Sequence, residues 1–248
     1  MKKYKYVVVF GCSMSAHREG YLVSLGETYG DVVAKHFGAK CYNLASAGAS
    51  LQHTSRSVLE WGSENKDKFK DTLVIVGKTN ICRIEIWNNK INDWYNDCGW
   101  FQPRKDAPWI KDRLVVDWPE EERKNYFINF YNDNVQFLYA THIIIGLQSF
   151  FKINDIDHVF FDALDTSLSD FWTRRCDDKK DRLGHKLLFD SFVSQENWYT
   201  HPEYYSMADF IGKNLELRLT KDDPHPNKEA HKFWGEYLIE FIDEKINI

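Results

Sequence analysis

The sequence has no long hydrophobic run and no excess of positive charge. None of its apolar stretches approaches the ~20 residues that a membrane-spanning helix needs. Asp and Glu number 37 against 32 Lys and Arg, which gives a formal net charge of -5 at pH 7, and the two signs are mixed along the chain. A nucleic-acid-binding protein would instead carry a basic stripe. We therefore expect neither a membrane protein nor a general nucleic-acid-binding protein.

Cysteine is also scarce, and its placement argues against two common frameworks. The 5 cysteines are an odd number, widely scattered, and contain no Cys-x-x-Cys pair. This favours neither a disulfide framework nor a zinc site, and a reducing compartment is the simplest inference. The apolar run Tyr6–Phe10 is shorter than the hydrophobic region of a signal peptide, which has roughly 7–15 residues. We expect a cytoplasmic protein without a bound metal.

Aromatic residues, in contrast, are abundant. Phe, Trp and Tyr make up 16% of the chain, with 9 Trp and 13 Tyr. Many of them fall among polar residues in two stretches without clear periodicity, about 81–118 and 163–215, which we interpret as insertions in a single domain spanning 1–248. The surplus predicts an aromatic surface that binds a flat ligand such as a sugar ring. An irregular subdomain with its own small aromatic core would produce the same pattern.

Short apolar runs alternate with helical patterns along the rest of the chain. Three runs end in turns rich in glycine or small residues, and the connections between them are long enough for helices. The expected strands are Tyr6–Phe10, 40–44, 72–76 and 157–161; the expected helices are 27–37, 50–61, 119–150, 185–192 and 228–246. This alternation predicts a three-layer α/β/α sandwich with a mainly parallel sheet of about five strands.

The turn after the first strand carries a candidate nucleophile. Gly11 permits a sharp turn that brings Ser13 to the carboxyl edge of the sheet, where ligands bind in open α/β folds. Taken alone, the motif is weak and favours a loop or helix-capping role for Ser13. Cys12 is a second possible nucleophile, but a turn aims only one of two adjacent side chains at a site. A small buried filler is the role we expect for Cys12.

A candidate base lies near the other end of the chain. His225 sits between Pro224 and Pro226, which hold the loop in an extended form. Asp222 and Asp223 precede it closely enough for one of them to fold back onto the imidazole ring. Acyl transfer by a serine needs such a base, a carboxylate that orients it, and donors for the oxyanion.

Four sequence blocks, spread over nearly the whole chain, resemble those of the SGNH (GDSL-type) hydrolases, a family named for its Ser, Gly, Asn and His blocks. Gly11-Cys12-Ser13 stands where the family usually has Gly-Asp-Ser, and Asn43-Leu44-Ala45-Ser46-Ala47-Gly48 resembles the second block. Gly77-Lys78-Thr79-Asn80 differs from the usual Gly-x-Asn-Asp by one extra residue and by the missing Asp. Asp222-Asp223-Pro224-His225 matches Asp-x-x-His directly.

The resemblance implies a serine hydrolase that uses no metal or cofactor. Ser13 would attack an ester, His225 would take its proton, and Asp222 would orient the ring, with Asp223 as the alternative. The Ser13 and Gly48 N–H groups and the Asn80 side chain would then bind the oxyanion.

The resemblance and the aromatic insertions together suggest a substrate class. The ester is expected to be a small molecule or a glycan, with an O-acetyl or other small acyl group on a carbohydrate as the first candidate. The departures at Cys12 and in the Asn80 block leave a second hypothesis open. In that hypothesis the chain is a non-catalytic glycan-binding or structural protein on the same scaffold.

Overall fold

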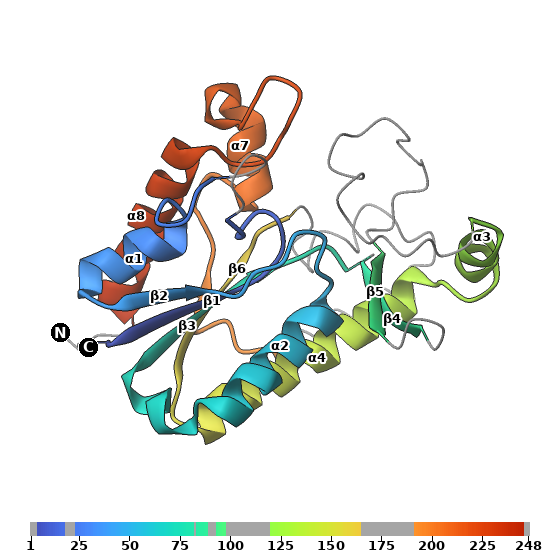
Figure 1. Cartoon of the computed structure of the whole chain (residues 1–248), viewed down its shortest axis with the longest axis horizontal. Coiled ribbons are helices and arrows are strands. Elements are labelled where there is room, and N and C mark those ends of the chain that lie inside the picture. The colour runs from blue at the N-terminus through green and yellow to red at the C-terminus, as the bar shows by residue number, and fades with distance from the viewer. Residues whose placement is uncertain are drawn as a thin grey trace.

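A central sheet of five parallel strands organises the molecule (Figure 1). The computed structural model describes residues 4–17, 23–81, 83–88, 93–97, 120–164 and 191–245. The strand order is β2-β1-β3-β6-β7. These strands are β1 (Tyr6–Phe10), β2 (Lys40–Asn43), β3 (Thr72–Lys78), β6 (Asp157–Asp162) and β7 (Trp198–Tyr199).

Helices cover both faces of this sheet, so the predicted α/β fold with a mainly parallel sheet is confirmed. Helices α1, α7 and α8 pack on one face, and α2 and α4 pack on the other. The helices are α1 (Tyr29–Phe37), α2 (Leu51–Glu64), α3 (Glu120–Asn129), α4 (Asp133–Ile153), α7 (Met207–Lys213) and α8 (Lys228–Lys245), with short 3-10 turns η1 (Lys66–Asp71) and η3 (Leu215–Leu217). No helix in the described part of the chain is both long enough and apolar enough to cross a membrane.

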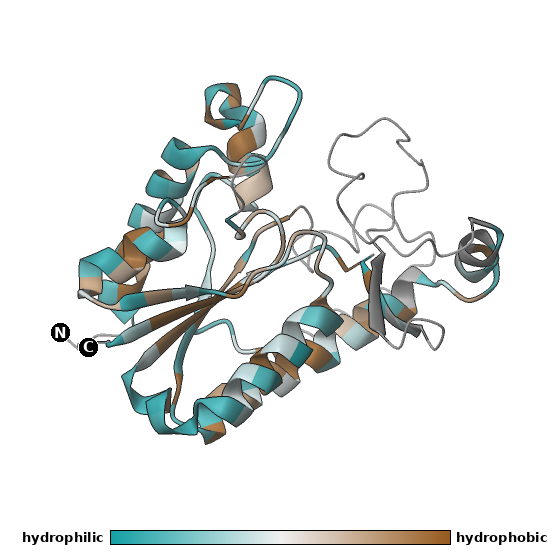
Figure 2. Cartoon of the chain, viewed as in Figure 1, coloured by the Kyte–Doolittle hydropathy of each residue, from teal (hydrophilic) through white to brown (hydrophobic). Residues whose placement is uncertain are grey.

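Strand β1, which lies between β2 and β3, shows why an unbroken apolar run was needed. Successive side chains of a strand point to opposite faces. Val7 and Val9 lie in the core under α1 and α8, whereas Val8 and Phe10 lie in the core under α2 and α4. All four are fully buried. Figure 2 shows the result, a hydrophobic sheet between helices whose outer sides are hydrophilic.

The two aromatic stretches contain structure that we did not expect from the sequence. The first includes an antiparallel hairpin of β4 (Ile84–Asn88) and β5 (Asp93–Asp97), and the second contributes β7 and α7. Strand β7 has only two residues and pairs with Phe160 and Phe161 of β6, so it carries too little periodicity to be recognised. Residues 98–119 and 165–190, which include most of the helix expected over 185–192, lie outside the described residues. The extent of the two insertions stays a prediction.

The single helix expected over 119–150 is wrong, because the structure has two helices there. Helix α3 ends where the N–H groups of Phe130 and Tyr131 both donate to the carbonyl of Tyr126, at 2.8 and 3.0 Å. The Asn132 side chain then accepts from the N–H of Val135 at 3.2 Å and caps α4. A capping asparagine inside a helical pattern therefore marks a boundary.

Candidate active site

The turn after β1 is tightly packed and presents Ser13. The N–H groups of Ser15 and Ala16 both donate to the carbonyl of Cys12, at 2.9 and 3.0 Å, which closes the turn. The Ser15 side chain is fully buried. A Cβ added at Gly11 would lie 2.6 Å from the Ser15 hydroxyl oxygen, so the backbone approaches this closely only because residue 11 is a glycine.

Ser13, His225 and Asp223 form a continuous chain of polar contacts. The Ser13 Oγ lies 2.9 Å from His225 Nε2, although the two residues are 212 positions apart. On the other side of the ring, His225 Nδ1 lies 2.5 Å from Asp223 Oδ1. With the ring proton on Nδ1, the imidazole donates to the carboxylate and accepts from the hydroxyl. This is the arrangement of a Ser-His-Asp triad.

The carboxylate on the ring comes from Asp223, whereas the Asp-x-x-His pattern pointed to Asp222. Asp223 Oδ1 also accepts from the backbone N–H of His225 at 3.0 Å. This contact, from a side chain to the backbone two residues on, is a local turn that aspartate favours, and it holds the carboxylate beside the ring. Asp222 is exposed to solvent. The spacing alone could not separate the two residues, because the direction of the turn decides between them.

Backbone hydrogen bonds fix the loop that carries His225. The N–H of Leu219 donates to the His225 carbonyl at 2.7 Å, and the N–H of Asn227 donates to the Leu217 carbonyl at 2.9 Å. The Asn227 side chain accepts from the N–H of Ala230 at 3.0 Å and so caps α8. The base is therefore held between the segment before the loop and the helix after it.

Cys12 is fully buried in the core beneath α1 and α8. Ser13 is 7% exposed, and its hydroxyl lies against His225. Of the two adjacent candidates, the serine therefore faces the imidazole, and Cys12 has the filler position expected for it.

The turn that carries Gly48 is tied directly to the nucleophile turn. The N–H of Ser46 donates to the Gly11 carbonyl at 3.0 Å. The Asn43 side chain donates to the Ser15 carbonyl at 2.7 Å. Gly48 is buried and has a φ of 81°, in the left-handed region that favours glycine. These contacts bring the second sequence block beside the first.

Asn80 follows the end of β3, the other neighbour of β1. The strands β2, β1 and β3 are adjacent and parallel, so their carboxyl ends lie at the same edge of the sheet. Gly48, Ser13 and Asn80 follow these three ends and therefore lie on one side of the sheet. The Arg83 guanidinium donates to the Ala49 carbonyl at 3.3 Å and so links this segment to the Gly48 turn. The topology brings the three expected oxyanion donors to one edge, and their role stays a prediction.

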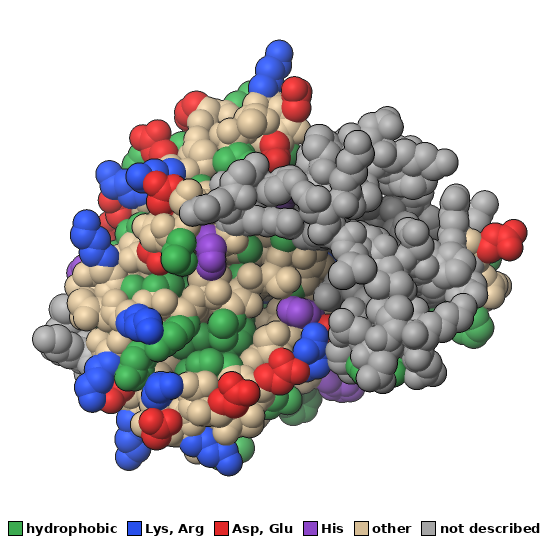
Figure 3. Space-filling view, viewed as in Figure 1, with side chains coloured by type: hydrophobic (Ala, Val, Ile, Leu, Met, Phe, Trp, Pro, Cys, Tyr) green, Lys and Arg blue, Asp and Glu red, His purple; other side chains and the backbone are tan. Residues whose placement is uncertain are grey.

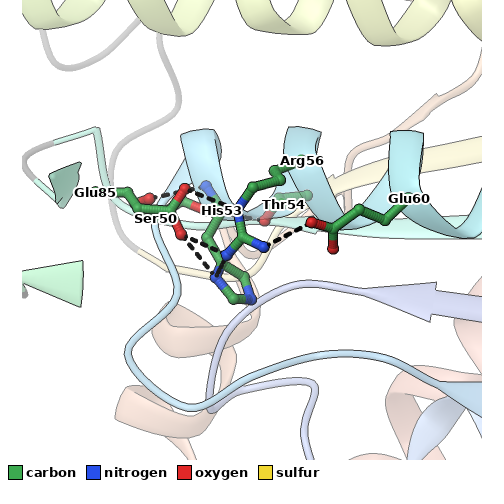
Figure 4. A network of polar contacts seen from close by, with 6 residues as sticks. All are labelled: Ser50, His53, Thr54, Arg56, Glu60 and Glu85. Carbon is green, nitrogen blue, oxygen red and sulfur yellow. Dashed lines mark hydrogen bonds and ion pairs between the residues drawn. The ribbon is translucent and has the colours of Figure 1, made fainter. Parts of the chain in front are cut away.

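A polar cluster that we did not identify from the sequence attaches the β4–β5 hairpin to α2 (Figure 4). Glu85 of β4 has a side chain only 2% exposed, and its Oε1 lies 2.8 Å from Arg56 and 3.0 Å from His53. Burial alone would raise the pKa of Glu85, but the hydrogen bonds from His53 and Arg56 outweigh it and lower that pKa. The only sequence signal was the pairing of His53 and Arg56 three positions apart on one helix face.

The face drawn in Figure 3 has no described patch of charges of one sign. Acidic and basic side chains are intermixed over the described part of the face in Figure 3, without a field of one sign. In the described ranges no three His, Cys, Asp or Glu side chains are grouped so that they could hold a metal ion.

Comparison with known proteins finds similarity of structure only. No protein-family model matches the sequence, and no curated protein matches it. The esterase EstA from Pseudoalteromonas sp. is 10% identical, with a TM-score of 0.53 over 98% of this chain and 100% of that one. The acetyl xylan esterase Est2A from the rumen bacterium Butyrivibrio proteoclasticus is 10% identical, with a TM-score of 0.52 over 98% of this chain and 65% of that one. TesA is 9% identical, with a TM-score of 0.50 over 97% of each chain.

Likeness at these identities concerns the fold. The strand order, the helical layers and these neighbours agree with the architecture implied by the four sequence blocks. The chain therefore has the fold of the SGNH hydrolases.

Proposed function

We propose that this protein is a serine esterase. The observation that carries the proposal is the continuous contact from Ser13 through His225 to Asp223 at the carboxyl edge of the sheet. Hydroxyl, imidazole and carboxylate in this order are the groups that acyl transfer by serine requires. The esterases among its structural neighbours support the same reaction class.

In the proposed mechanism the Ser13 oxygen attacks the carbonyl carbon of the ester while His225 Nε2 takes the hydroxyl proton. Asp223 holds the Nδ1 proton and stabilises the imidazolium that forms. The tetrahedral intermediate then expels the alcohol, which receives the proton from His225. Water attacks the acyl-enzyme with His225 again as base, and the released acid restores Ser13.

The negative charge that develops on the carbonyl oxygen needs donors fixed in advance. We assign this role to the N–H groups of Ser13 and Gly48 and to the Asn80 amide. Loss of one such donor typically lowers kcat by ~10²–10³. The contacts between the Gly48 turn and the nucleophile turn support the assignment, because they hold two of the donors in one unit.

The proposed substrate is an O-acetyl or similar small acyl ester of a carbohydrate. Trp87 on the β4–β5 hairpin is 42% exposed, and this hairpin begins four residues after Asn80. An exposed aromatic face this close to Asn80 in the sequence suits a sugar ring. The similarity to an acetyl xylan esterase points in the same direction.

Hydrolysis of p-nitrophenyl acetate by the full chain tests the proposal. Ser13→Ala should lower turnover by at least about 10⁴-fold and leave the thermal melting temperature within a few degrees. Cys12→Ala is the matched control, because it removes the neighbouring thiol and should retain most of the turnover. Undiminished activity in Ser13→Ala would exclude Ser13 as the nucleophile.

A phosphonate probe gives a second measurement that needs no correct substrate. The Pseudoalteromonas esterase was solved in a form inhibited by monoethylphosphonate, so this chemistry suits the fold. Labelling should be lost in both Ser13→Ala and His225→Ala. Absence of labelling in the native chain, together with saturable binding of an acetylated polysaccharide, would instead support the non-catalytic glycan-binding hypothesis.

A further inference from the structure

A buried ion pair joins the last residues of β3 and β6. Lys78 Nζ lies 2.6 Å from Asp162 Oδ1, with the two side chains 0% and 9% exposed. The two residues are direct partners in the parallel ladder. Trp198 of β7 donates from Nε1 to Asp162 Oδ2 at 3.3 Å. One carboxylate therefore ties together three strands at the edge of the sheet where Ser13 lies.

Stability alone gives little reason for charges at this position. Removing two charges from water is costly, and well-packed apolar residues of similar volume are often at least as stable as a buried ion pair. An ion pair differs from an apolar contact because its geometry is specific. A short contact between two fully or nearly buried groups allows few alternative positions for the strand end that carries Lys78.

The chain immediately after Lys78 leads into the candidate site. The Lys78 carbonyl accepts from the N–H groups of Ala163 and Leu164, at 3.0 and 3.4 Å. Lys78 is therefore held through its side chain and its backbone. Thr79 is fully buried, and the next residue is Asn80. Any displacement at the end of β3 would be transmitted directly to the Asn80 amide.

We propose that Lys78 and Asp162 are positioning residues that hold Asn80 in place to stabilise the oxyanion. The inference rests on the proposed esterase function and on the role given there to Asn80. An oxyanion donor acts on the transition state more than on the bound substrate, so its displacement lowers kcat and leaves KM nearly unchanged.

A double-mutant cycle on p-nitrophenyl acetate hydrolysis measures the coupling. Lys78→Met with Asp162→Asn removes both charges together and leaves an acceptor for Trp198, so no unpaired charge remains buried. Asn80→Ala is then measured in the native chain and in this charge-free chain. We expect a loss in kcat of ~10²–10³ from Asn80→Ala in the native chain and of less than about 10-fold in the charge-free chain.

The opposite end of β6, the strand that carries Asp162, supplies a matched control. Tyr4 donates to Asp157 at 2.7 Å, and Asp157 begins β6. In Tyr4→Phe with Asp157→Asn, the Asn80→Ala loss should keep its full size. Thermal melting establishes that each background is folded, and Lys78→Met with Asp162→Leu replaces the first double variant if that one is not.

The outcomes separate the inference from the function on which it rests. Equal losses from Asn80→Ala in the native and charge-free chains would overturn the positioning role while the esterase stands. No loss from Asn80→Ala in the native chain, with Ser13→Ala inactive, would overturn it as well. A native chain that hydrolyses no ester and takes up no phosphonate would overturn the esterase itself and the inference with it.

Discussion

The two halves of the candidate triad are held by different kinds of interaction. The nucleophile turn is held by close packing. Ser13 is 7% exposed, and the neighbouring Ser15 side chain fills the space left by Gly11 and Gly77. The loop that carries His225 is held mainly by hydrogen bonds. Its His225 and Asp223 side chains are 31% and 23% exposed. Changes in the first should disturb the core, and changes in the second should disturb mainly the chemistry.

The difference follows from where each half lies. The nucleophile turn continues β1, an interior strand flanked by β2 and β3, so any atom added there meets neighbouring strands. The base loop precedes α8 at the surface, where backbone groups can be satisfied by one another or by water. A rigid nucleophile therefore faces a base whose orientation depends on a few polar contacts.

The largest separation between activity and stability is expected for Asp223→Asn. The asparagine keeps the shape of the side chain but no longer stabilises a charged imidazole, so kcat should fall by roughly 10³–10⁴-fold. The melting temperature should change little, because the group is partly exposed. Asp222→Asn is the matched control and should stay within a few-fold of the native kcat. Equal losses of kcat in both variants would contradict the assignment of Asp223 as the carboxylate that orients His225.

Gly77→Ala tests how strongly close packing fixes the nucleophile turn. A Cβ at residue 77 would lie 2.6 Å from the Ser15 hydroxyl oxygen, so the nucleophile turn must shift, and overpacking of this kind costs about 1–3 kcal/mol. Both the free energy of unfolding and kcat should fall, as measured by urea unfolding and p-nitrophenyl acetate hydrolysis. Adding Ser15→Ala removes the clashing atom and should restore part of both. Gly146→Ala in α4, where a Cβ meets nothing within 4 Å, should be neutral or stabilising.

A pH-dependent effect is expected where α8 joins α1. His231 accepts from the N–H of Tyr29 at 3.3 Å, and burial lowers the pKa of His231 to about 3. The unfolded chain binds a proton near pH 6.5 and the folded chain does not, so stability is complete above pH 6.5 and is lost as the pH falls towards 3.

The slope of that loss identifies the residue. It should not exceed about 1.4 kcal/mol per pH unit for one histidine. His231→Asn, which keeps an acceptor for Tyr29, should show a shallower decline in urea unfolding between pH 6.5 and pH 4. His142→Asn, at an exposed position in α4, should keep the native slope. An unchanged slope in His231→Asn would assign the acid sensitivity to other groups.

The smallest effects are expected from the aromatic stretch after Asn80. Single changes of Trp94, Trp100 and Trp109 to Ala should raise KM several-fold for a natural glycan ester and hardly at all for p-nitrophenyl acetate, because a small ester does not reach a sugar platform. Equal effects on both substrates, or loss of folding in all three variants, would assign these residues to a local core instead.

Much of the fold and part of the site could be predicted from the sequence. Val7 to Phe10 form an unbroken buried run that is typical of a parallel strand covered on both faces, and Gly11 marks its end. Strand β7 could not be predicted, because the pairing of Trp198 and Tyr199 is defined by β6 and not by their own pattern.

The site shows the same division between local and tertiary information. Ser13 and His225 each follow a recognisable local signal. The choice of Asp223 over Asp222 depends on the direction of one turn, and the hairpin depends on the ion pair of Glu85 with Arg56 of α2. The first contact depends on the backbone conformation of the loop, and the second joins two elements, so residue spacing alone defines neither of them.

The separation of 212 residues between Ser13 and His225 has a consequence for the timing of activity. At a synthesis rate of about 5–20 residues per second, the base emerges from the ribosome roughly 10–40 s after the serine. During that interval β2 and β3, the neighbours of β1, are already synthesised, but the serine has no base. The chain therefore acquires its reactivity in one late step, when α8 docks beside α1. A molecule arrested before that step has a Ser13 hydroxyl without a base and is unreactive.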